Sequence, residues 1–221
     1  MRPLITAVVV DNGEEILERC LQSLRLQAVP MEIIVASGPK TDLAVAKRYA
    51  DLVLDPVAGM GRARVQAILE AETPYILSCD SDTVYDSKYA EVACQDLKTL
   101  RAVRAGSIRP LEGSPVAWVE TATQLAFAYE FSLAFRRQAF LDAGIHRIDY
   151  SKPKNDIGIG VLMRLLPFPD PRMVCWTRMP TYHAELAVQY APIALAGLVP
   201  LTASAVAALG NEVAKMVEKR G

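Results

Sequence analysis

Two aspartates separated by one residue are the clearest sign of chemistry in this chain. Asp80 and Asp82 follow residues 75–79, a short apolar run that predicts a buried strand. Side chains two positions apart in an extended or turn backbone can point to the same side. Two carboxylates placed this way can hold a divalent cation, which in turn can hold a diphosphate. The alternative is that one aspartate caps a helix entered near Ser87, and the motif alone does not separate the two interpretations.

A loop rich in glycine and arginine precedes the aspartates. Gly59, Gly61, Arg62 and Arg64 open a predicted helix that runs to about Ala71. Glycines let backbone N–H groups approach a ligand, a helix N-terminus favours anions, and arginines bind phosphate. The loop lacks the Lys-Ser/Thr ending of a phosphate-binding loop, so an ordinary helix start with solvated arginines is the alternative.

The elements that must position these residues alternate regularly in the first half of the chain. Apolar runs predict strands at residues 4–10, 32–36, 52–54 and 75–79, and helical spacing predicts a helix in each interval between them. This alternation predicts an α/β fold with a parallel sheet covered by helices, and such sheets bind ligands at the carboxyl ends of their strands. Asp11, Ser37 and Asp80 all lie at such ends, which favours a ligand site.

The second half of the chain is less regular. Helices are expected at residues 87–100, 115–131, 138–143 and 157–166, and strands at residues 107–109, 133–137 and 173–179. The strand at 107–109 is expected at an edge of the sheet. Asp156 stands directly before the last of these helices, where an isolated aspartate can simply be an N-cap.

Composition restricts the class of protein. The chain has 24 Lys and Arg residues against 25 Asp and Glu residues, which argues against a nucleic-acid binder that relies on bulk positive charge. Its cysteines show no paired metal spacing, and we expect reduced, buried thiols in a cytoplasmic protein. These cysteines are Cys20, Cys79, Cys94 and Cys175.

One long uncharged segment lies near the C-terminus. Residues 186–211 carry no charge and contain Pro192 and Pro200. Two short helices packed against the domain, a hairpin resting on a bilayer and a membrane span are the alternatives, and the prolines make a span the least suited. Lys215 and Lys219 follow, and basic residues beside an apolar segment suit a position at the cytoplasmic face of a membrane.

The order of these motifs resembles that of the family 2 glycosyltransferases with the GT-A fold, over about residues 4–183. The matching segments are the first strand and helix, the loop at 59–67, the Asp-Ser-Asp motif, the segment 133–144, and Asn155 with Asp156 where the family has Glu-Asp. The resemblance implies a Rossmann-like, mostly parallel central sheet flanked by helices over residues 1–183. Residues 1–100 would form the nucleotide-binding half and 101–183 the acceptor-binding half, followed by an apolar helical extension over 184–221.

The resemblance also implies a reaction: metal-dependent, inverting transfer of a hexose from a UDP- or GDP-sugar. Asp82 would ligate Mn²⁺ or Mg²⁺ directly, Asp80 would bind the ribose or a metal-bound water, and His183 would be an additional metal ligand. Asp156 would accept the proton of the acceptor hydroxyl. The remaining residues expected at the nucleotide or the diphosphate are Asp11, Asn12, Glu14, Ser37, Asp42, Arg62, Arg64 and Ser81.

Two departures from the family pattern affect the donor pocket. Asn12, Gly13 and Glu14 stand where the family has Tyr-Asn-Glu, and Ala36 with Ser37 stands where it has two aspartates. These changes leave the nucleotide base undetermined. They also leave room for a non-catalytic member of the fold, while the acidic segment after the first strand disfavours another alternative, a sugar-phosphate nucleotidyltransferase.

The partners expected from the resemblance are a nucleotide-diphosphate sugar and an acceptor. The acceptor is either a sugar or glycan, or a polyprenyl phosphate, and the apolar C-terminal segment suits the latter. A membrane surface is a further expected partner, nucleic acid is not, and the oligomeric state, a homodimer included, stays open.

Overall fold

The computed structural model describes residues 2–111, 130–152 and 157–178. Their strands form one eight-stranded sheet in the order β3-β2-β1-β4-β7-β6-β8-β5. The strands are β1 (Ile5–Asp11), β2 (Met31–Ser37), β3 (Leu52–Leu54), β4 (Tyr75–Asp80), β5 (Thr83–Tyr85), β6 (Ala102–Pro110), β7 (Leu133–Arg136) and β8 (Phe168–Thr177). The α-helices are α1 (Leu17–Arg25), α2 (Leu43–Tyr49), α3 (Met60–Glu70), α4 (Tyr89–Asp96), α6 (Arg137–Asp142) and α7 (Ile157–Leu165).

The parallel half of the sheet confirms the alternation predicted from the sequence. Strand β1 lies between β2 and β4 and runs parallel to both, and β3 continues the sheet beside β2. Every residue of β1 is buried, as expected for a strand covered on both faces. The register pairs Asp11 with Ser37 and Val10 with Asp80, so the polar ends of three strands meet at one edge.

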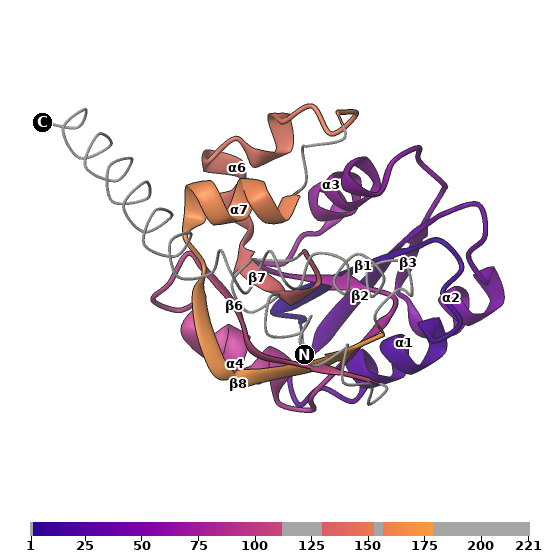
Figure 1. Cartoon of the computed structure of the whole chain (residues 1–221), viewed down its shortest axis with the longest axis horizontal. Helices are drawn as coiled ribbons and strands as arrows, with labels where there is room; N and C mark the ends of the chain where they lie inside the picture. Colours follow the sequence, from indigo (N-terminus) through magenta and orange to yellow (C-terminus); the bar gives the residue numbers. More distant parts are fainter. Residues whose placement is uncertain (1, 112–129, 153–156, 179–221) are drawn as a thin grey trace, which may run out of the picture. The chain divides into compact units, whose positions relative to one another are not determined.

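Helices cover both faces of the sheet (Figure 1). Ile5, Ala7 and Val9 of β1 pack in one hydrophobic cluster with α1 and α4, while Val8 and Val10 pack in a second cluster with α3, α6 and α7. This division follows from the two-residue period of a strand. The layers confirm a mixed α/β fold with a central sheet flanked by helices.

The antiparallel additions to the sheet differ most from the sequence prediction. Strand β7 pairs antiparallel with both β4 and β6, and β8 pairs parallel with β6 and antiparallel with β5. The expected edge strand at 107–109 is part of the longer, internal β6, so that prediction is wrong. Gly106 obscures the strand pattern, but it lies at a register shift, and a Cβ on it would come within 2.6 Å of the Asp170 backbone.

The ends of β8 also differ from the prediction. The strand was expected to begin at residue 173, but it begins at Phe168 and includes Pro169 and Pro171. Pro171 lies beside the register shift near Gly106, and such irregularities are positions where a strand tolerates proline.

The segment after Asp82 is not a direct helix start. It forms β5, and α4 begins only at Tyr89, so the interpretation of the motif as a helix cap is wrong. The backbone N–H of Lys88 instead donates to the Asp86 carboxylate at 2.9 Å. Neither Asp80 nor Asp82 therefore caps α4, so helix capping does not explain why these two aspartates stand here.

Two short 3₁₀ helices complete the described elements, η1 (Glu130–Ser132) and η2 (Ile145–Arg147). The helix predicted over 115–131 lies outside the described residues except for its end, which is η1. The C-terminal segment 186–211 also lies outside them. Among the helices that the structure describes, none combines the length and the apolar character needed to cross a membrane. All four cysteines are free and buried, as predicted.

Candidate functional site

The carboxyl ends of β1, β2 and β4 bring most of the predicted ligand residues to one edge of the sheet. Asp11 ends β1, Ser37 ends β2, and Asp80 ends β4. The Ser81 N–H continues the β4 pairing by donating to the Val10 carbonyl at 3.3 Å, so the Asp-Ser-Asp motif begins on a fixed strand end. This edge is the position at which α/β sheets bind ligands.

Arg64 of α3 lies beneath this edge, and only 1% of its side chain is exposed. Its Nη1 donates to the Ser78 hydroxyl at 2.9 Å and to the Cys79 carbonyl at 2.8 Å, and its Nη2 contacts the Asp80 carboxylate. The sequence predicted that Arg64 would contact a diphosphate. The structure instead shows it as the internal counter-ion of Asp80, so it would act on a ligand through that aspartate.

Glu130 is a third member of this group, and no sequence motif predicted it. Its Oε2 lies 3.2 Å from Arg64 Nη2, and its Oε1 accepts a hydrogen bond of 2.8 Å from the Ile157 N–H. Glu130 is the only charged residue between positions 121 and 135. Because a charge in an apolar stretch is rarely buried without a partner, this isolation was the signal that could have found it.

Burial and charge act against each other in this group. Burial lowers the pKa of the Arg64 guanidinium, but the Asp80 and Glu130 carboxylates raise it further, so the net shift is upward and the arginine stays charged. Removal from water raises the pKa of Asp80, which Arg64 partly offsets. Since 34% of the Asp80 side chain remains exposed, its carboxylate can still face a ligand.

Asp82 lies in a more negative environment than Asp80. Burial, and then the charge of Asp80, raise the pKa of Asp82 to about 7, while a 3.0 Å hydrogen bond from the Thr83 hydroxyl opposes the shift. Glu14 adds to the rise. The backbone of Asp82 has its own contact, because its carbonyl accepts a 2.8 Å hydrogen bond from the Arg178 N–H.

The raised pKa of Asp82 predicts a pH-dependent stability. An unfolded aspartate ionises near pH 4, so between about pH 4 and pH 7 the folded protein binds the extra proton and its stability falls as the pH rises. Asp82→Asn removes this cost. We expect urea unfolding without metal to give a variant about 1–2 kcal/mol more stable than wild type at about pH 8, after allowance for the exposed part of the side chain, and equal to it at about pH 4. An equal difference at both pH values would contradict the assignment.

The charge at this edge fits a divalent cation. Asp80 and Asp82 offer hard oxygen donors. Burial and then the charge of Asp80 raise the pKa of Asp82, and a bound cation would offset both effects. Over residues 2–111, 130–152 and 157–178, no group of three or more His, Cys, Asp or Glu side chains is placed to hold a metal. His183, the predicted third ligand, and Asp156, the predicted base, both lie outside the described residues.

Several residues predicted at the nucleotide have partners inside the protein. The Asp11 carboxylate accepts from the Gly13 and Glu14 N–H groups at 3.0 and 3.1 Å. The Ser37 hydroxyl donates to the Leu54 carbonyl at 2.6 Å, and the Asp42 carboxylate caps α2. Three other predicted residues are exposed, and these are Asn12, Glu14 and Arg62.

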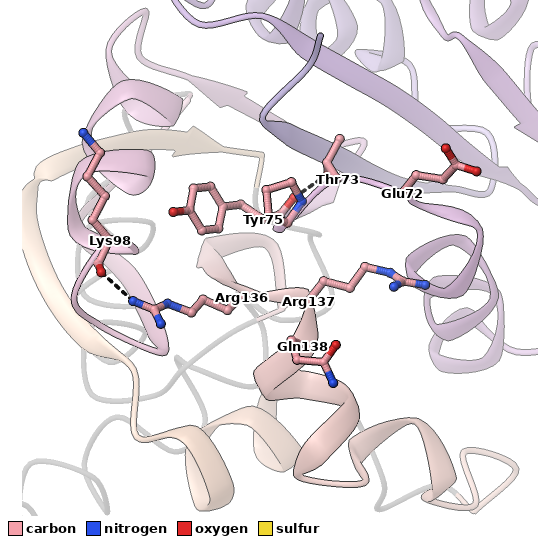
Figure 2. Close-up of a pocket in the computed structure, with 8 residues that line it drawn as sticks. Glu72, Thr73, Tyr75, Lys98, Arg136, Arg137 and Gln138 are labelled. Atoms are coloured by element: carbon pink, nitrogen blue, oxygen red, sulfur yellow. Dashed lines mark hydrogen bonds between the residues drawn. The ribbon is translucent and has the colours of Figure 1, made fainter.

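A cavity of about 530 Å³ lies at the opposite end of β4, near Tyr75 (Figure 2). Arg136 and Arg137 line it, but each guanidinium donates to helix-end carbonyls. Arg136 binds those of Leu97 and Lys98, and Arg137 binds those that end α3. These contacts satisfy carbonyls that lack partners within a helix, so the arginines have a structural role here. None of the predicted site residues lines this cavity.

The mixed sheet with helices on both faces matches the GT-A fold. Residues 6–149 match the family described as glycosyl transferase family 2. The chain belongs to that family, as the resemblance in its sequence motifs implied. No curated protein matches the chain.

Solved structures support the same fold at low sequence identity. TarS from S. aureus in complex with UDP-GlcNAc is 15% identical with a TM-score of 0.57, and the match covers 80% of this chain and 58% of that one. A larger S. aureus TarS structure gives a TM-score of 0.57 at 15% identity, over 79% of this chain and 36% of that one. This chain therefore spans less than two thirds of TarS.

A mannosyltransferase from Pyrobaculum calidifontis, in complex with GDP-Man and Mn²⁺, matches over more of its length. It is 18% identical with a TM-score of 0.59, and the match covers 97% of this chain and 81% of that one. Glycosyltransferases with bound nucleotide sugars thus share this fold.

Proposed function

We propose that the protein is a metal-dependent, inverting glycosyltransferase that moves a sugar from a nucleotide-diphosphate sugar to a lipid-linked or glycan acceptor. The observation that carries the proposal is the pair Asp80 and Asp82 at the carboxyl end of β4, with no role in starting α4. Family membership and neighbours that hold UDP-GlcNAc or GDP-Man support the donor class.

Each described residue has a separate role in the proposal. A divalent cation, Mn²⁺ or Mg²⁺, would neutralise the charge that develops on the leaving nucleotide diphosphate. Asp82 would hold the cation directly, because its carboxylate is buried beside the charge of Asp80 and would be stabilised by a nearby positive charge. Asp80, fixed by Arg64, would bind the ribose or a metal-bound water, and the exposed Arg62 is available to the diphosphate.

The proposed roles on the acceptor side are argued from the sequence, because Asp156 and residues 186–211 lie outside the described residues. Asp156 would accept the proton of an acceptor hydroxyl as it attacks the anomeric carbon. An ionised polyprenyl phosphate needs no base, and in that case Asp156 would position the acceptor. The uncharged segment 186–211 suits a protein that meets such an acceptor at the cytoplasmic face of a membrane.

A binding panel tests the proposal. Thermal unfolding is measured with GDP, UDP, GDP-mannose and UDP-N-acetylglucosamine, each with and without Mn²⁺. A ligand that binds only the folded state raises the melting temperature by mass action, and we expect at least one nucleotide to do so only with the metal.

Nucleotide diphosphate release from the two sugars, measured with Mn²⁺, then separates the alternatives. Metal-dependent binding with slow release supports a transferase. Binding without release under any condition supports a non-catalytic member of the fold, and no binding at all contradicts the proposal.

A further inference from the structure

The Glu130 carboxylate connects two parts of the site that are distant in sequence. One oxygen lies 3.2 Å from Arg64 Nη2, and the other accepts the 2.8 Å hydrogen bond from the Ile157 N–H. The same Arg64 nitrogen contacts Asp80. A single guanidinium nitrogen therefore lies between the carboxylate that ends β4 and the carboxylate that holds the first residue of α7.

The bond to Ile157 has a clear physical basis. The first N–H groups of a helix lack partners within it, and a negative charge there is favoured by the helix dipole. Glu130 provides both the acceptor and the charge, but it does so from η1 rather than from a neighbouring residue in sequence. The start of α7 is thus fixed against η1 and, through Arg64, against the end of β4.

The contacts that Glu130 makes with Arg64 and Ile157 are strong because they are buried. Only 17% of the Glu130 side chain is exposed, and Arg64 is almost fully buried. The carbonyls beside Glu130 are held as well, because the Tyr85 hydroxyl donates to the Phe131 carbonyl at 3.0 Å and the Tyr89 hydroxyl donates to the Ser132 carbonyl at 3.2 Å. The Glu130 carboxylate therefore lies next to backbone that two buried tyrosine hydroxyls hold in place.

We propose that Glu130 is a positioning residue, which sets the start of α7 relative to Asp80 and so aligns acceptor with donor; this inference rests on the proposed function. In the sequence, Asp156 directly precedes the residue that Glu130 holds. Both Glu130 oxygens have protein partners, so the role assigned to Glu130 is positioning. Misplacement by about 1 Å can lower a transfer rate about 100-fold, so loss of this contact affects the acceptor reaction strongly.

The test compares Glu130→Gln with Tyr85→Phe. Glutamine keeps the size of the side chain but replaces one oxygen with an NH₂ group. Because Arg64 and the Ile157 N–H face different oxygens of Glu130, one of these two donors then meets the NH₂ group and loses its acceptor. Tyr85→Phe removes the bond to the Phe131 carbonyl and loosens the same turn without touching Arg64 or α7. It therefore controls for general destabilisation of η1.

The first readout is the ratio of transfer to hydrolysis. GDP-mannose and UDP-N-acetylglucosamine are supplied in turn with Mn²⁺, and glycosylation of a polyprenyl phosphate in phosphatidylglycerol vesicles is compared with release of the sugar to water. We expect Glu130→Gln to lower transfer about 10- to 100-fold with hydrolysis changed less than about threefold. Equal losses in both reactions, or the same change of ratio in Tyr85→Phe, would overturn the inference.

The second readout does not need activity. Hydrogen exchange at the peptide that begins α7 should be faster in Glu130→Gln than in wild type and unchanged in Tyr85→Phe. If wild type binds and cleaves neither donor, the proposed function fails, and exchange alone decides whether Glu130 fixes α7. Unchanged exchange in Glu130→Gln would refute that contact whatever the activity.

Discussion

Asp82→Asn is expected to lower metal-dependent release of nucleotide diphosphate about 1,000-fold, equivalent to about 4 kcal/mol of transition-state stabilisation. The substitution keeps the shape of the side chain and removes the charge that would hold the cation beside the leaving diphosphate. The fold should persist, because the pKa of Asp82 is already raised to about 7 and a neutral side chain suits its surroundings. Steady-state release with GDP-mannose or UDP-N-acetylglucosamine, at several Mn²⁺ concentrations, measures the effect.

Asp86→Asn is the matched control for this experiment. It makes the same chemical change four residues later, where the carboxylate accepts a local hydrogen bond from the Lys88 N–H. We expect its release rate to stay within about twofold of wild type. An Asp82 variant that kept full activity together with metal-dependent donor binding would disprove the metal assignment.

Arg64→Met is expected to cost about 3 kcal/mol of unfolding free energy, a larger change in stability than Asp82→Asn produces. Methionine fills a similar volume, but it leaves the Asp80 and Glu130 carboxylates facing each other without their shared cation. The value lies at the lower end for a broken buried pair because a third of Asp80 is exposed. Urea unfolding at neutral pH, without metal, gives the measurement.

Arg62→Met, two positions earlier on the same helix, makes the identical substitution at an exposed site. Its unfolding free energy should stay within about 0.5 kcal/mol of wild type. If both methionine variants were equally stable, the buried guanidinium would have no structural role.

The parallel half of the fold could be predicted because its signals are local. Continuous apolar strands such as β1 alternate with amphipathic helices, and the topology of such units is strongly restricted. The antiparallel half could not be predicted in the same way. Strand β8 contains Pro171 and β6 contains Gly106, and both residues lie at a register shift between strands that are far apart in sequence.

In the candidate site, too, local features could be predicted from the sequence and long-range contacts could not. The position of Asp80 at the end of a buried strand could be predicted, since strand and motif are adjacent in sequence. The partner of Arg64 could not be predicted from the sequence. Whether an arginine faces a ligand or the protein interior depends on how α3 packs on the sheet. Glu130 was missed for the same reason, as its two partners lie about 66 and 27 residues away.

The four buried cysteines make the folded protein resistant to thiol chemistry. Burial raises the pKa of every one of these thiols, to about 12 for Cys79 and about 11 for Cys94, so hardly any reactive thiolate forms at neutral pH. Cys20 is also in contact with the Asp80 carbonyl, directly beneath the acidic motif. Labelling by a thiol reagent therefore reports opening of the folded core, and a disulfide found in purified protein would mark chains that had unfolded and not a redox switch.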